Sequence, residues 1–62
     1  MNSQNEYMKI YFSLTVAMMI ADDISNEILG DQIRDILDSL YYKYLTEESI
    51  KKINKKLIKV NP

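Results

Sequence analysis

The fold depends most on residues 10–21, which read IYFSLTVAMMIA and contain no charged side chain. Apolar residues alternate with more polar ones between residues 8 and 18, which is the period of a strand. Helical three–four spacing fits as well and continues ten residues further, through the apolar side chains at positions 7, 10, 14, 17, 21, 24 and 28. We predict a helix, because residues 17–21 (AMMIA) favour one and a lone strand would have no mate.

Outward from this run, the sequence predicts an all-α, three-helix unit in a single domain of residues 1–62. The first helix is expected over about residues 5–29, with Gly30 as its C-terminal stop. An amphipathic helix is expected over about 31–45, with Asp31 as its N-cap. A basic helix is expected over about 47–59, capped by Thr46.

The first helix is apolar on nearly every side, since Met8, Phe12, Val16 and Met19 form a second stripe beside the first. Two short helices can cover one of these stripes, and a domain of this size is marginally stable alone. A tight monomer built around a central first helix is one solution. We instead predict a homodimer, because large exposed apolar patches are uncommon on monomers. The expected self-interface residues are Met8, Tyr11, Phe12, Thr15 and Met19.

Composition excludes most catalytic and metal chemistry. The chain has no cysteine or histidine and a single glycine, so disulfides, thiolate or histidine metal sites, Ser–His–Asp triads and glycine-rich phosphate loops cannot form. The acidic residues lack the spacing of a calcium loop. We therefore expect a protein that is not an enzyme and that has no cofactor and no metal.

The sequence also bears on compartment. The apolar run is too short to cross a bilayer, and the polar, acidic residues 2–7 before it are unlike a secretory leader. The absence of cysteine fits a reducing compartment. We expect a cytoplasmic protein without a membrane partner.

Charge is divided along the chain. Residues 1–50 hold nine acids and three bases, a balance of −6, whereas residues 51–62 hold five lysines and no acid, a balance of +5. Both could be ordinary solvated faces. We predict that the acidic face binds another protein, because charge steers association. The expected partner-binding residues are Asp31, Asp35, Asp38 and Tyr42. A possible nucleic-acid contact is formed by Lys51, Lys52, Lys55, Lys56 and Lys59.

These observations predict a small adaptor or inhibitor that occludes or bridges a partner protein. The alternative is a dimeric nucleic-acid-binding regulator that uses the lysine-rich helix, or a ribbon–helix–helix-like protein with residues 9–16 as its strand. The nucleic-acid alternative is weaker, because the only arginine, Arg34, lies outside the lysine-rich segment and no aromatic residue lies among the lysines.

Residues 34–42 read RDILDSLYY, and LTEE follows at 45–48. This stretch resembles small helical proteins of phages and other mobile elements, which carry R-D-x-x-D-x-L-aromatic-Tyr followed by L-T/S-x-E-E. Compared with that pattern, this chain has one inserted residue, Tyr44, between the two parts. The resemblance implies an accessory or counter-defence context, and it implies no mechanism and no functional residue.

Overall fold

The computed structural model describes residues 3–60, and side chains up to residue 56. It contains helices α1 (Gln4–Asp23), α2 (Glu27–Ser39) and α3 (Glu47–Val60), with a π-helical turn η1 (Leu40–Tyr44) that extends α2. The prediction of an all-α, three-helix chain is confirmed. Residues 8–18 are helical throughout, so the strand interpretation of this segment is wrong.

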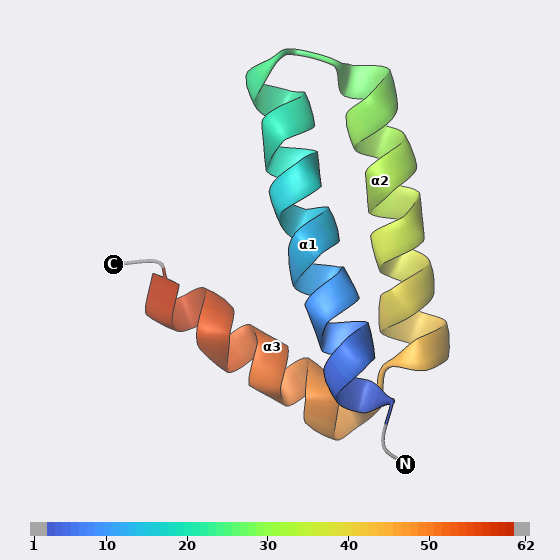
Figure 1. The fold of residues 1–62 in the computed structure, drawn as a ribbon, viewed down its shortest axis with the longest axis vertical. Coiled ribbons are helices and arrows are strands. Elements are labelled where there is room, and N and C mark those ends of the chain that lie inside the picture. The colour runs from blue at the N-terminus through green and yellow to red at the C-terminus, as the bar shows by residue number, and fades with distance from the viewer. Residues whose placement is uncertain (1–2, 61–62) are drawn as a thin grey trace.

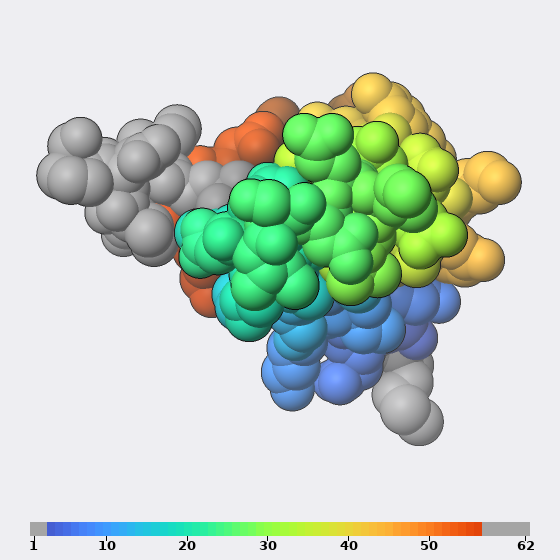
Figure 2. Space-filling view, turned by 90° about the horizontal axis from the view of Figure 1, so that it is seen from above, coloured from blue at the N-terminus to red at the C-terminus, as the bar shows by residue number. Residues whose placement is uncertain are grey.

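The helices form an antiparallel hairpin and one arm (Figure 1). Helices α1 and α2 lie side by side, and α3 leaves from the open end of the hairpin and diverges from α1. Viewed from the hairpin turn, α3 emerges behind the hairpin (Figure 2). Accordingly, α1 contacts α2 far more extensively than it contacts α3.

The first helix ends six residues earlier than predicted, at Asp23 rather than at about residue 29. The chain turns through residues 24–26, where Ser25 adopts a left-handed φ of 60°. Asn26 then caps α2, because its side-chain oxygen accepts a hydrogen bond of 3.1 Å from the Leu29 amide. The predicted Asp31 cap is therefore wrong, since Asp31 lies inside α2.

Gly30 does not stop a helix; it lies buried within α2. A Cβ atom placed on it would lie 3.0 Å from Asp22 Oδ1 and 4.0 Å from Ala21 Cβ. Ala21 is itself only 2% exposed. The missing side chain thus leaves room for Asp22 and Ala21 of α1 beside α2, at the cost of about 1 kcal/mol that glycine carries in a helix interior.

The core is small and lies mostly toward the open end of the hairpin. Its buried apolar side chains are Ala21, Leu37, Leu40, Leu45 and Ile53. The predicted cap of α3 is confirmed, since Thr46 Oγ1 accepts a hydrogen bond of 3.2 Å from the Ser49 amide. Where α2 ends, the Leu45 amide donates to the Leu40 carbonyl at 2.9 Å, the i→i+5 bond of the π-turn.

Gln4 joins the start of α1 to the start of α3. Its Nε2 donates to the Tyr44 carbonyl at 2.9 Å, and its Oε1 accepts from the Thr46 amide at 3.0 Å and from the Ser49 hydroxyl at 2.7 Å. Ser49 is almost fully buried, so this cluster satisfies a polar group in the core.

A single copy leaves much of α1 uncovered, as the two apolar stripes predict. Val16, Met19 and Ile20 are each more than half exposed. Ile24 and Ile28, which were expected to extend the first stripe, lie in the turn and at the start of α2 and are exposed as well. Among residues 3–60, no helix combines the length and the apolar character needed to cross a bilayer.

Candidate binding surfaces

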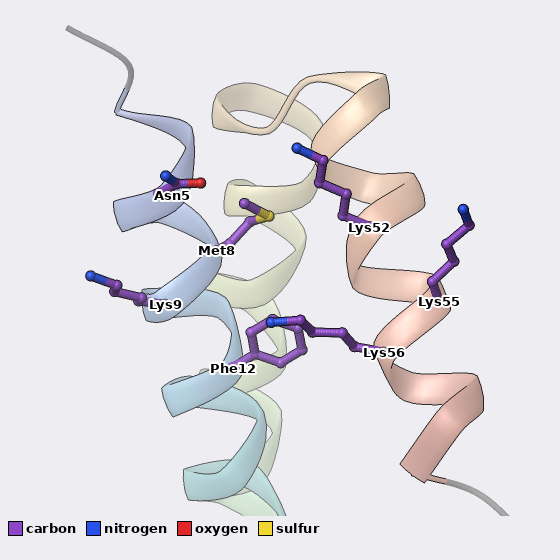
Figure 3. Close-up of a pocket in the computed structure, with 7 residues that line it drawn as sticks. All are labelled: Asn5, Met8, Lys9, Phe12, Lys52, Lys55 and Lys56. Atoms are coloured by element: carbon purple, nitrogen blue, oxygen red, sulfur yellow. The ribbon is translucent and has the colours of Figure 1, made fainter.

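A cleft of about 430 Å³ lies between α1 and α3 (Figure 3). Its lining combines an apolar floor with basic residues, and consists of Asn5, Met8, Lys9, Phe12, Lys52, Lys55 and Lys56. Met8 and Phe12 point from α1 toward α3, and Lys56 points back across Phe12. Lys52 reaches toward α1, whereas Lys9 and Lys55 stand at the outer edges.

The cleft is strongly cationic. Lys56 Nζ lies 5.5 Å from the centroid of the Phe12 ring, within the range of a cation–π contact. Lys9 Nζ lies 3.7 Å from Glu6 Oε2, and both side chains are mostly exposed, so this ion pair is weak. Within the part of the chain whose side chains are described, no carboxylate lies within ion-pair distance of Lys52, Lys55 or Lys56.

The remaining basic residues predicted to contact nucleic acid lie elsewhere. Lys51 is exposed on α3 outside the cleft. Lys59 belongs to α3, and its side chain lies outside the described residues. Three of the five predicted lysines therefore line the cleft, and two of them, Lys52 and Lys56, point toward α1.

The five predicted self-interface residues lie on different sides of α1. Met8 and Phe12 line the α1–α3 cleft. Tyr11 and Thr15 line a separate, shallower hollow beside α2, together with Arg34 and Asp38 among others. Met19 is exposed and lines neither the α1–α3 cleft nor the hollow beside α2. Burial, with smaller contributions from Tyr41 and Asp38, raises the pKa of the Tyr11 phenol.

The predicted partner-binding residues form one acidic stripe along α2 and η1, defined here as Asp31, Asp35, Asp38 and Tyr42. Their spacings of four, three and four residues place them on one side of the helix, and all four are exposed. Tyr42 is 80% exposed, the highest value among the large apolar and aromatic side chains described. Its ring packs edge-on against Tyr41 at 5.0 Å.

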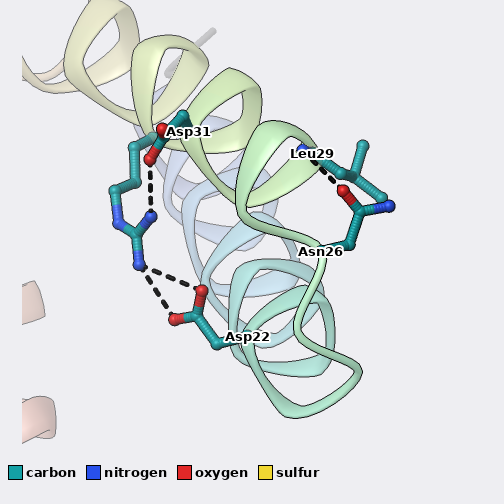
Figure 4. Close-up of polar contacts among 5 residues, drawn as sticks. Asp22, Asn26, Leu29 and Asp31 are labelled. Atoms are coloured by element: carbon teal, nitrogen blue, oxygen red, sulfur yellow. Dashed lines mark hydrogen bonds and ion pairs between the residues drawn. The ribbon is translucent and has the colours of Figure 1, made fainter.

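One end of the stripe has an internal partner (Figure 4). Arg34 Nη1 lies 3.0 Å from Asp31 Oδ1, and Arg34 Nη2 contacts both carboxylate oxygens of Asp22 at 2.9 and 3.1 Å. The arginine therefore joins α1 to α2. Asp35 and Asp38, in contrast, make no ion pair with any side chain that the structure describes.

Sequence reasoning did not find the Gln4 cluster or the Arg34 bridge. Both join residues far apart in sequence, and periodicity within a helix carries no signal for such pairs. No group of three or more acidic residues among those described is arranged to hold a metal ion. Comparison with known proteins gave no match among family models, curated proteins or solved structures.

Proposed function

We propose that this chain is a small, non-enzymatic protein-binding protein, an adaptor or inhibitor that occludes or bridges a basic partner through the acidic stripe of α2 and η1. The observation that carries this proposal is the exposure of Tyr42 beside two carboxylates, Asp35 and Asp38, that have no ion-pair partner among the described residues.

An exposed tyrosine next to unpaired carboxylates suits an interface. Aromatic residues supply a large contact area at a low entropic cost, and they are enriched among the residues that dominate binding energy. Carboxylates around such an anchor attract a basic surface and reject an acidic one. Because Asp31, Asp35 and Asp38 lie on α2 and Tyr42 lies on the π-helical turn that continues it, helical backbone already positions these side chains before the partner arrives.

Three further elements belong to the proposal. The exposed Val16, Met19 and Ile20 support burial of α1 against a second copy. The cysteine-free composition supports a cytoplasmic location. The resemblance of residues 34–48 to mobile-element proteins supports an accessory or counter-defence role, in which occlusion of a host protein is the simplest mechanism.

Charge reversal tests the stripe. The Asp35→Lys/Asp38→Lys variant should lose a captured protein that the wild-type chain retains from a host lysate, with helicity by circular dichroism unchanged. Tyr42→Ala should weaken the same capture. Asp23→Lys/Glu27→Lys is the matched control, because it changes the net charge equally at exposed acids outside the stripe. Retention of the same protein by the stripe variant at wild-type levels would refute the proposal.

Nucleic-acid binding through α3 is a second candidate, favoured by the exposed lysines of that helix that lack ion-pair partners among the described residues. The ribbon form of this idea is wrong, because residues 9–16 are helical. If three lysines contact phosphates, DNA retention should fall with salt at a logarithmic slope of roughly −3. A flat salt dependence would exclude this candidate.

A further inference from the structure

The α1–α3 cleft combines two properties, an apolar floor and a basic edge. Its floor is apolar, formed by Met8 and Phe12, and its edges carry four lysines. An exposed lysine helix needs no apolar floor to stay hydrated, and an apolar contact between helices does not need lysines on its inner side. A ligand that is both apolar and anionic would match both properties.

The described carboxylates of this chain do not supply that anionic group. Glu6, at the outer edge near Lys9, is the one carboxylate in ion-pair contact with a cleft lysine among residues 3–56. The acidic stripe lies on α2 and η1, and neither contributes a residue to the described cleft lining. The positive charge facing Met8 and Phe12 is therefore left for an external group.

The floor can also accept a side chain. Lys56 covers the Phe12 ring through a cation–π contact at 5.5 Å, and this flexible side chain can swing aside without moving the backbone. Met8 is unbranched and polarizable, so it adapts to different apolar shapes. The volume of about 430 Å³ accommodates one or two large side chains together with the backbone that carries them.

We propose that the α1–α3 cleft binds a short acidic segment of another protein that carries an apolar side chain at its centre. The apolar side chain contacts Met8 and Phe12, and flanking carboxylates meet Lys52 and Lys56 on one side and Lys9 on the other. This site is distinct from the acidic stripe, so the chain would bridge two ligands of opposite charge.

The same features argue against nucleic acid in this cleft. Single strands bind through stacking of successive bases on several aromatic faces, and Phe12 is the only aromatic residue in the described lining. A short peptide with local charge and an apolar centre fits better.

An NMR titration at 150 mM salt tests the proposal, with the unlabelled octapeptide EDELFDED as the probe. We expect saturable shifts of the Met8 methyl and Phe12 ring signals. The peptide EDESSDED, which has the same charge and lacks the apolar centre, should bind at least fivefold more weakly. Equal binding of the two peptides would overturn the proposal, because recognition would then be by charge alone.

Variants locate the site. Lys52→Glu/Lys56→Glu should weaken EDELFDED binding at least tenfold, whereas Lys43→Glu/Lys51→Glu, an equal charge change at exposed lysines outside the cleft, should stay within about threefold of wild type. Met8→Gln provides a test that leaves the charge unchanged, and should weaken binding at least threefold. Equal losses in both lysine variants would overturn the site.

Two competing ligands complete the test. An oligothymidylate of eight nucleotides and vesicles containing phosphatidylglycerol should each bind more weakly than EDELFDED. Tighter binding of either one, with the same dependence on Lys52 and Lys56, would overturn the peptide assignment in favour of a nucleic-acid or membrane ligand.

Discussion

The α1–α2 hairpin and the α3 arm are both built from amphipathic helices, but buried contacts hold the hairpin along its whole length and the arm only at its start. The hairpin is held along its length, by the close approach of Gly30 to Ala21 near the turn and by buried Leu37 and Leu40 toward the open end. The buried residues described on α3 are Ser49 and Ile53, one helical turn apart. The arm is thus anchored at its first turns and diverges beyond them.

The difference lies in which residues face α1. On α2 the buried Gly30 and Leu37 lie beside α1 and Arg34 bridges to Asp22, so the two helices close on each other. On α3, Lys52 and Lys56 face Met8 and Phe12. Bringing lysine ammonium groups against an apolar floor would strip their hydration, which is costly unless an anion compensates. The lysines therefore keep the cleft open, and the same residues give it its proposed ligand.

The largest expected effect is on the anchor of the arm. Ile53 is 1% exposed, and Ile53→Ala should lower the free energy of unfolding by about 3 kcal/mol, through lost burial and the cavity left behind. In a domain this small the arm should detach. Hydrogen exchange should then show α3 amides exposed while α2 amides stay protected, and equal loss of protection in both helices would contradict the separation between hairpin and arm.

Gln4 is the second anchor of the arm. Gln4→Ala removes the bonds to Tyr44, Thr46 and Ser49, and should cost about 1–2 kcal/mol in urea unfolding. Gln4→Glu is the control, because a carboxylate still accepts from Thr46 and Ser49, although its second oxygen cannot donate to the Tyr44 carbonyl and repels it. It should cost less than Gln4→Ala. The opposite order would show that the Tyr44 bond dominates the cluster.

These two anchors also mark the limit of what the sequence predicts. Local signals sufficed for the third helix, where Thr46 and the two glutamates after it define the start of α3. Ile53 belongs to the apolar stripe of that helix. Gln4, in contrast, lies 40 or more residues from its partners and looks like an ordinary polar residue near the start of the chain.

The hairpin turn was misplaced for a related reason. Gly30 is a common C-terminal stop when a helix is considered alone, but here it serves contact between two helices. The correct signal was present at Asn26, a strong N-cap residue followed by Glu27. The α1–α3 cleft could not be predicted at all, because the direction in which Lys52 and Lys56 point depends on how α3 docks.

Replacing a cleft lysine tests whether the lysines are the reason that α3 diverges from α1 while α2 packs against it. Lys56→Leu removes the charge above Phe12 and lets α3 close on α1, as α2 does. We expect a gain of about 0.5–1 kcal/mol in unfolding free energy, because new apolar contact exceeds the lost cation–π contact. Lys51→Leu, on the same helix outside the cleft, should change stability by less. Equal gains would mean that helix propensity, and not closure, is responsible.

The smallest effect should come from the hairpin, where close approach competes with helix propensity. Gly30→Ala gains about 1 kcal/mol in propensity, but its Cβ would lie 3.0 Å from Asp22 Oδ1 and 3.4 Å from Arg34 Nη1. Both side chains are about 44% exposed and can yield, at the expense of a weak ion pair. The net change should therefore be a gain of only a few tenths of a kcal/mol.

Gly30→Ala in an Asp22→Ala background separates the gain in helix propensity from the cost of placing a methyl group against the Asp22 carboxylate. With the carboxylate removed, Gly30→Ala should recover most of its propensity gain, so a double-mutant cycle measured by thermal unfolding should give a favourable coupling of about 0.5 kcal/mol. Zero coupling would mean that Ala21, on the other side of the added methyl group, limits the approach of the helices. In that case the spacing of the hairpin is set by backbone packing alone, and Arg34 only tethers a contact that small residues already determine.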